Sequence, residues 1–109
     1  MTKREVQDVL AEIARRIAAR FNPDKVILFG SHARGTAGED SDADLLVVMR
    51  VSGSKRAQAV QIDLALEGIP IPTDVIVVTP EEVEKYRDCP GTIIQEALRE
   101  GKTIHERAA

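Results

Sequence analysis

The chain has 109 residues, of which 43% are hydrophobic and 30% charged, so it can form one domain with a mostly aliphatic core but not two domains. Its net charge of −3 argues against a general nucleic-acid binder, which carries a basic surface, and no apolar run approaches the ~20 residues of a membrane span. A single cysteine, Cys89, excludes an intrachain disulfide and fits a reducing cytoplasm, where we expect the protein to act.

The first part of the chain predicts a helix, a strand and a tight turn. The segment Thr2-Lys3-Arg4-Glu5 has the pattern of a capping box, in which two side chains satisfy amides at a helix start. Apolar residues follow at helical spacing, and the helix is expected to end near Phe21 because the residue before Pro23 avoids helical angles. Residues 25–29 (KVILF) predict a buried strand, and residues 31–35 one short helical turn.

The rest of the chain alternates between strands and helices. The predicted elements are strands at 43–49 and 74–78, helices starting at Ser54, Thr79 and Thr92, and a short final strand at 102–105. Gly68 is the predicted C-terminal cap of the helix from Ser54 to about Glu67. Because this helix joins the two strands, we expect them to be parallel, with a right-handed crossover. The class is therefore α/β, a small mixed sheet flanked by helices, in a single domain covering residues 1–109.

Three aspartates stand at the starts of predicted strands. Asp42 and Asp44 are two residues apart, so their side chains share a face, with Cα atoms roughly 7 Å apart. Asp74 joins them if its strand lies beside theirs. Unpaired carboxylates repel one another unless hard cations neutralise them, and magnesium accepts few protein ligands alongside phosphate oxygens. The pattern predicts that these aspartates hold two magnesium ions for the chemistry of nucleotidyl transfer, in which one oxygen is activated and another departs.

The turn after the first strand has the residues of a phosphate site. Gly30 permits close backbone approach to a ligand, and Ser31 offers a hydroxyl and an amide to terminal phosphate oxygens. Arg34 adds a permanent positive charge in the same turn. Ser41, which precedes Asp42, is the fourth residue assigned to nucleotide binding and orients the loop.

These residues carry a resemblance to a known family. The chain resembles the DNA polymerase β-like nucleotidyltransferase superfamily in its signature, which is Gly30-Ser31, then ten residues, then Asp42-Ala43-Asp44. Within it, the chain is similar to the minimal nucleotidyltransferases (MNT proteins), whose Phe-Gly-Ser-x-Ala-Arg-Gly and Ser-Asp-x-Asp-Leu pattern is present from Phe29 to Leu45. The resemblance continues to Asp74 and to the terminal Gly-Lys-x-Ile, and so covers nearly the whole chain.

The resemblance implies a fold, an activity and a partner. MNT proteins have the polymerase β-like fold and are commonly the antitoxin of a two-gene pair. The toxin is a small helical HEPN protein with RNase character, and some of these antitoxins transfer AMP from ATP onto a toxin tyrosine. By this resemblance the chain is expected to be a magnesium-dependent adenylyltransferase with ATP as its substrate. Its size argues for a partner independently, because an acceptor-binding surface must come from another protein or from a second copy in a homo-oligomer.

Several alternatives stay open. The chain could neutralise a toxin by occlusion alone, without catalysis. A topoisomerase–primase-like domain would need a glutamate where Gly30-Ser31 ends the first strand, and a glycosyltransferase with Asp-x-Asp needs a longer chain. At single positions, Asp42 and Asp44 could satisfy turn amides and Ser31 could cap a helix. Asp74 could merely begin a strand, Arg34 could form a surface pair with Glu39 or Asp40, and His32 could lie at the surface.

Overall fold

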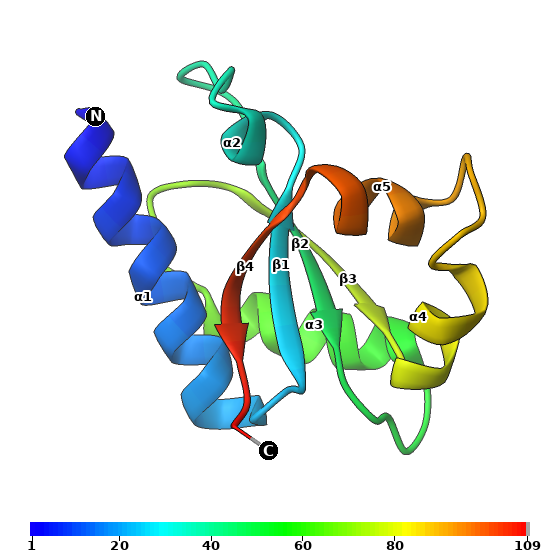
Figure 1. Ribbon diagram of the computed structural model, residues 1–109. Helices are drawn as coiled ribbons and strands as arrows, with labels where there is room; N and C mark the ends of the chain where they lie inside the picture. Colours follow the sequence, from blue (N-terminus) through cyan, green and yellow to red (C-terminus); the bar gives the residue numbers. More distant parts are fainter. Residues whose placement is uncertain (109) are drawn as a thin grey trace.

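The computed structural model describes residues 1–108 and shows a four-stranded mixed sheet with helices on both faces (Figure 1). In chain order the elements are α1 (Lys3–Phe21), β1 (Lys25–Phe29), α2 (Ser31–Arg34), β2 (Ala43–Val48), α3 (Lys55–Ala65), β3 (Thr73–Val78), α4 (Pro80–Tyr86), α5 (Ile93–Glu100) and β4 (Lys102–Glu106). The predicted α/β class and order of elements are confirmed, while Ala109, the last residue of the predicted domain, lies outside the described residues.

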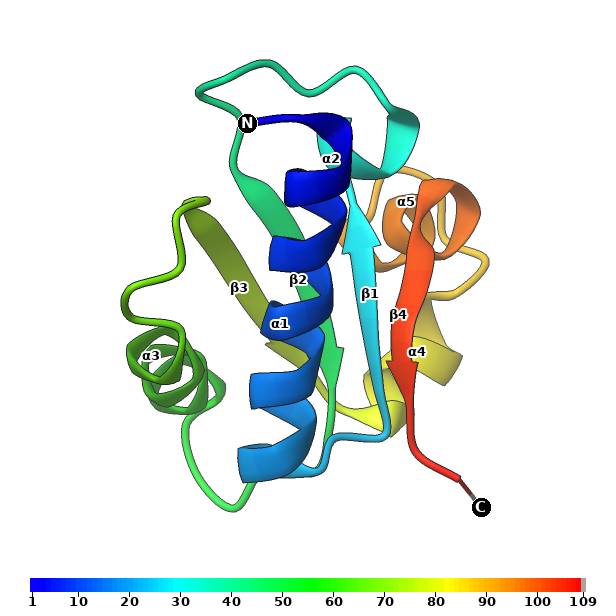
Figure 2. The ribbon, with the colours of Figure 1, turned by 90° about the vertical axis from the view of Figure 1, so that its left-hand side faces the viewer.

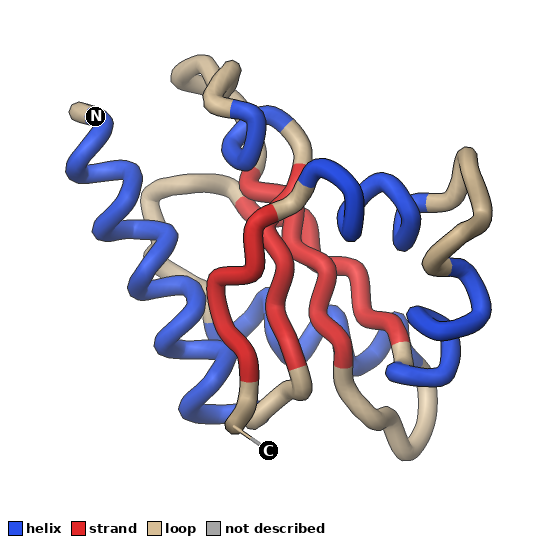
Figure 3. The backbone as a smooth tube through the Cα atoms, viewed as in Figure 1, coloured by secondary structure: helices blue, strands red, loops and turns tan. Residues whose placement is uncertain are grey.

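The strands lie in the order β3-β2-β1-β4, side by side in Figure 3. β1 is antiparallel to both of its neighbours, β2 and β4. β2 and β3 are parallel, as expected for strands joined through a helix, with α3 between them in the chain. The starts of β2 and β3 therefore lie together beside the end of β1, at the edge of the sheet that is formed by strand ends and not by an outer strand.

Both faces of the sheet are covered, because successive residues of a strand point to opposite sides. Leu45 and Val47 of β2 pack in the cluster that includes Ile13 and Ile17 of α1 and Ile62 of α3. On the other face, β2 and β1 pack against Ile94 and Ala97 of α5, with Val83 of α4 at the margin. Figure 2 shows α1 in front of the sheet and α5 behind it. The prediction that β2 is buried on both faces is confirmed.

Local sequence explains most of the helix ends. Thr2 and Glu5 form the predicted capping box of α1, with bonds of 2.9 and 3.1 Å, and Thr79 and Glu82 form that of α4. The predicted cap at Gly68 is wrong, because α3 ends at Ala65 with Leu66 as its C-cap. β1 has the predicted ends, and each of the other three strands differs from the prediction by a single residue at one end, within the usual uncertainty of element boundaries.

A contact with α1 gives the physical reason for the early end of α3. Arg16 of α1 donates hydrogen bonds to the carbonyls of Ala65 and Glu67, at 3.4 and 2.9 Å, and Leu66 is buried. Carbonyls of a last helical turn need such partners. Within residues 1–108, none of the helices is both long enough and apolar enough to cross a membrane.

Gly101 allows α5 to pass directly into β4 against β1. A Cβ atom at this position would lie 2.5 Å from Cγ2 of Ile27 and 2.9 Å from the carbonyl oxygen of Leu28. We expect Gly101→Ala to lower the free energy of unfolding by about 1–3 kcal/mol, because overpacking forces backbone shifts. Urea denaturation followed by circular dichroism measures this. Gly38→Ala is the matched control, since a Cβ there meets nothing within 4 Å; equal loss in both variants would contradict the packing argument.

Candidate active site

The strand register brings two of the three predicted aspartates side by side. Asp44 of β2 is paired with Asp74 of β3, and on its other side with Phe29 of β1. Neighbouring strands lie about 4.8 Å apart, so the two carboxylates emerge next to each other. Asp42 precedes β2 and, two residues before Asp44, projects to the same face. This is the face covered in part by α5.

The carboxylates of Asp42, Asp44 and Asp74 are not neutralised by ion pairs in the part of the chain that the structure describes. Asp42 and Asp74 are exposed and Asp44 is half-buried. The hydrogen bonds of the described segments also show no amide held by Asp42 or Asp44, so a turn-stabilising role does not account for them.

Burial and repulsion act together on Asp44. Burial raises the pKa of its carboxyl above the ordinary value of 3.8, and the charges of Asp74, Asp42 and Glu96 raise it further. His32 acts in the opposite direction. Glu96 lies on α5 and was not foreseen from the sequence. Four carboxylates therefore contribute negative potential at this edge of the sheet.

The donor set fits a cation shared with a ligand. Among the described residues, no group of three or more His, Cys, Asp or Glu side chains forms a ready-made metal site. Magnesium is usually held by one or two carboxylates together with phosphate oxygens and water, so it does not need such a cage. The adjacent, unpaired carboxylates of Asp44 and Asp74, with Asp42 beside them, match that requirement.

The raised pKa of Asp44 predicts a gain in stability when its charge is removed. A folded-state pKa above the unfolded value means that stability is full below the unfolded value of 3.8 and falls as the pH rises through the folded value. In metal-free buffer, Asp44→Asn should therefore raise the melting temperature at pH 7, and the gain should disappear below about pH 4. Thermal scans with a chelator across this range measure it. A variant that is less stable at pH 7 would show that Asp44 is compensated.

Gly30 makes room for the Asp44 carboxylate. A Cβ atom on Gly30 would collide with Oδ2 of Asp44 and lie 3.2 Å from its Cγ. The residue also has φ 74° and ψ −154°, a conformation that side chains other than glycine rarely adopt. The close neighbour of Gly30 in the structure is thus Asp44, and the predicted close approach of Gly30 to a ligand stays a prediction.

Ser31 begins α2 and does not cap it. The N-cap residue is Gly30, without a side-chain cap bond, so the alternative that Ser31 is a helix cap is wrong. The carbonyl of Gly30 accepts from the amides of Ala33 and Arg34, at 3.1 and 3.0 Å. The amides of Ser31 and His32, in the first turn, lack partners within the helix. This arrangement suits an anion, as predicted for the terminal phosphates.

Ser41 and His32 fix the loop that leads to Asp42. The Oγ of Ser41 accepts a hydrogen bond from the Gly38 amide at 2.9 Å, and the Ser41 amide donates to the Gly38 carbonyl at 3.2 Å. Nε2 of His32 lies 3.1 Å from the carbonyl oxygen of Ser41. Ser41 therefore orients the loop as expected, and its contact with a nucleotide stays a prediction. His32 is half-buried, and its contact with Ser41 joins α2 to this loop. The sequence did not indicate this role, because His32 occupies a variable position of the family pattern.

Arg34 is paired at the surface, but with a partner distant in sequence. Its Nη1 atom donates to Oε2 of Glu100 on α5 at 3.3 Å, across 66 residues. The alternative that it pairs with Glu39 or Asp40 is therefore wrong. No local signal identifies Glu100, because the contact depends on how α5 packs on the sheet.

A cavity of about 650 Å³ lies behind the loop, on the α1 side of the sheet, lined by Val6, Gln7, His32, Ser41 and Ile71 among others. Its lining does not include the three aspartates. The carboxylate edge, formed by Asp42, Asp44 and Asp74, is thus separate from this cavity.

The geometry agrees with a known family. The family model described as a nucleotidyltransferase domain matches residues 10–103, which contain the glycine-serine turn and all three aspartates. The chain belongs to the nucleotidyltransferase domain family. A solved structure described as a minimal nucleotidyltransferase is 31% identical, with a TM-score of 0.60 over 90% of this chain and 92% of that one. The resemblance to the minimal nucleotidyltransferases and their fold is thereby confirmed.

Curated relatives in this nucleotidyltransferase family carry the name protein adenylyltransferase. A Methanocaldococcus jannaschii protein, to which that name is given provisionally, is 37% identical over 73 residues, or 63% of this chain and 50% of its own. Protein adenylyltransferase MntA of Thermococcus cleftensis is 38% identical over 47 residues, 43% of this chain and 48% of its own. The chain spans about half the length of the curated relatives it matches.

A toxin–antitoxin complex contains the same fold. The complex joins a tri-AMPylated Shewanella oneidensis HEPN toxin to an MNT antitoxin, and the match has a TM-score of 0.55 over 92% of this chain and 71% of that one. Sequence identity is 16%, so this likeness is one of fold alone.

Proposed function

We propose that this nucleotidyltransferase is a magnesium-dependent protein adenylyltransferase. It transfers AMP from ATP to a tyrosine hydroxyl of a partner HEPN toxin and thereby acts as an antitoxin. The observation that carries the proposal is the pairing of Asp44 with Asp74, neither of which forms a salt bridge among the described residues, next to the turn of Gly30 and Ser31. The name of the curated relatives supports adenylyl transfer to protein, and the complex with an AMPylated HEPN toxin supports the choice of partner.

Each part of the site has a role in this reaction. Asp42, Asp44 and Asp74 would hold the magnesium ions, which supply positive charge to the departing pyrophosphate and acidify the attacking hydroxyl. Ser31 and the free amides at the start of α2 would bind terminal phosphate oxygens. Arg34 would contribute a cation to the same phosphates. The half-buried position of Asp44 strengthens these interactions relative to water.

The bond changes are those of a single displacement at phosphorus. The acceptor oxygen forms a bond to the α-phosphorus of ATP while the bond from that phosphorus to the oxygen bridging to the β-phosphate breaks. Pyrophosphate leaves with the electron pair. The hydroxyl proton passes to the carboxylate of Asp74, the exposed member of the adjacent pair.

Label transfer tests the proposal directly. The purified chain, magnesium and ATP labelled on the α-phosphate are incubated with the cognate HEPN toxin, beside a reaction with ATP labelled on the γ-phosphate. Label on the toxin from the first ATP alone, with pyrophosphate released, is the expected result. Absence of label, in spite of a stable complex and measured binding of magnesium and ATP, would overturn it in favour of occlusion.

A further inference from the structure

Glu100 of α5 connects arginines from two different elements. Its Oε2 atom accepts from Nη1 of Arg34 at 3.3 Å, and its Oε1 atom accepts from Nη2 of Arg99 at 3.2 Å. One carboxylate balances only one guanidinium, so the three side chains leave one net positive charge. Arg34 lies on α2, the short helix that begins at Ser31, so this charge stands within a helical turn of the predicted phosphate site.

Both arginines retain most of their hydrogen-bonding capacity. A guanidinium has five N–H donors, and within residues 1–108 Arg34 and Arg99 each use one of them on a side chain. Their bonds are also longer than the 2.7–2.9 Å typical of charge-assisted pairs. Arg15, by contrast, donates to both carboxylate oxygens of Glu12, from Nε at 2.8 Å and from Nη2 at 2.7 Å. The side chains of Arg34 and Arg99 are 46% and 64% exposed, so a ligand can reach them.

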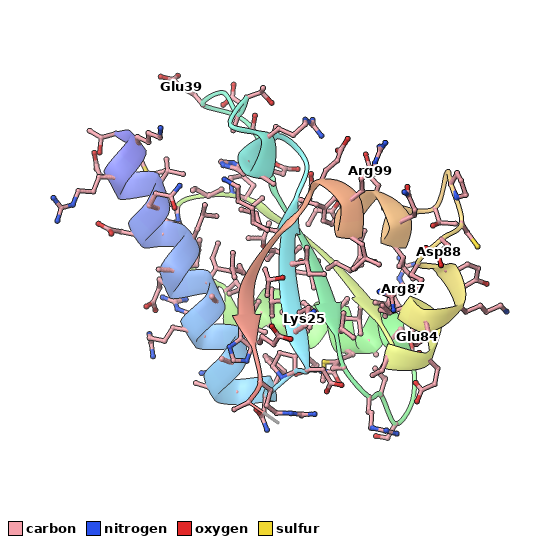
Figure 4. All side chains as sticks on the ribbon, in the orientation of Figure 1. Lys25, Glu39, Glu84, Arg87, Asp88 and Arg99 are labelled. Carbon is pink, nitrogen blue, oxygen red and sulfur yellow. The ribbon has the colours of Figure 1, made fainter. Side chains whose placement is uncertain are left out.

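The face of α5 that carries Arg99 turns toward the carboxylate edge. Glu96, Arg99 and Glu100 are spaced i, i+3 and i+4 and so share one face of the helix. Glu96 lies close enough to act electrostatically on Asp44, while Glu100, one turn later, reaches α2. Glu96 and Arg99 also border a cavity of about 460 Å³ along α5. Figure 4 shows Arg99 projecting from α5 at the end of the molecule where α2 lies.

We propose that Arg99 is a second phosphate-binding arginine, which contacts the β- and γ-phosphates of the nucleoside triphosphate together with Arg34. The proposal rests on the proposed function, because it assigns a residue to the nucleotide of that reaction. A triphosphate carries several negative charges on its phosphate oxygens. The forked N–H donors of a guanidinium can bind two of these oxygens at once. The carboxylates mark one end of the site and the two arginines mark the other.

Binding measurements on two variants and one control test it. Arg99→Ala should raise the Kd for ATP in the presence of magnesium about tenfold and leave the Kd for AMP unchanged, because AMP lacks the β- and γ-phosphates. Arg99→Lys, which keeps the charge, should recover part of the loss. Arg87→Ala is the matched control, since Arg87 is an exposed arginine paired with a carboxylate, Glu84, at 3.0 Å. Its removal should not change either Kd.

The outcomes separate this inference from the proposed function. If the unaltered chain binds no ATP with magnesium, the proposed function fails, and the role of Arg99 fails with it. If the unaltered chain binds ATP and Arg99→Ala binds it equally well, only the inference is overturned. An equal loss of ATP and AMP affinity, or the same loss in Arg87→Ala, also overturns it, because the effect would then come from net charge or folding.

Discussion

Replacement of both Asp42 and Asp44 by asparagine is expected to reduce label transfer to the toxin by roughly 10³-fold or more. Asparagine keeps the shape of the side chain and removes its charge. The register that places residue 44 against Asp74 would be retained, but Asp74 would be the last of the three aspartates left to hold the cations. The initial rate of toxin labelling, at saturating ATP and magnesium, measures the effect.

The control for this double variant is Asp40→Asn, which changes an exposed carboxylate in the loop before Asp42. It should label the toxin at the unaltered rate. Complex formation, followed by size-exclusion chromatography, should persist in both variants. If the double variant still neutralises the toxin in cells, occlusion and not transfer is the antitoxin mechanism; if it still transfers AMP at full rate, the aspartates are not the catalytic groups.

Gly30→Ala is expected to reduce transfer by about 100-fold, since a displacement of about 1 Å at a reacting group can cost that much. The new methyl group would collide with the Asp44 carboxylate and push it away from Asp74. The positive φ of 74° adds strain, so the free energy of unfolding should also fall by about 1–3 kcal/mol. Transfer kinetics and urea denaturation of the same preparation measure both effects.

Gly35→Ala separates collision from strain. Gly35 also has a positive φ, 77°, but a Cβ there meets nothing within 4 Å. We expect this control to lose about 1–2 kcal/mol of stability and to keep its transfer rate. Equal losses of activity in the two variants would show that backbone strain, and not the placement of Asp44, determines the effect of Gly30→Ala.

The parts of the fold that were predicted correctly depend on short-range patterns. The capping boxes at Thr2 and Thr79 act within one turn, so α1 and α4 begin where the sequence indicates. The parallel pairing of β2 and β3 follows from the helix between them. The end of α3 was mispredicted, because it depends on Arg16 of α1, a residue about fifty positions away.

The candidate site likewise contains residues that short-range patterns predict and residues that only tertiary packing brings there. Asp42 and Asp44 share a face by strand periodicity alone, and the parallel register adds Asp74. Glu96 and Glu100 could not be found, since their approach to Asp44 and Arg34 depends on how α5 packs against β1 and β2. The steric role of Gly30 likewise needs the three-dimensional position of the Asp44 side chain.

β3 is the outermost strand on its side of the sheet, with β2 as its neighbour, so Asp74 stands on the rim of the molecule. Under the proposed function, a tyrosine on an intact folded surface can approach this rim from the flank without being threaded into a pocket. The same openness admits water to the reacting phosphorus. Under the proposed function, the bound acceptor protein would therefore have to cover this exposed side of the site and exclude water, so that transfer would depend directly on docking.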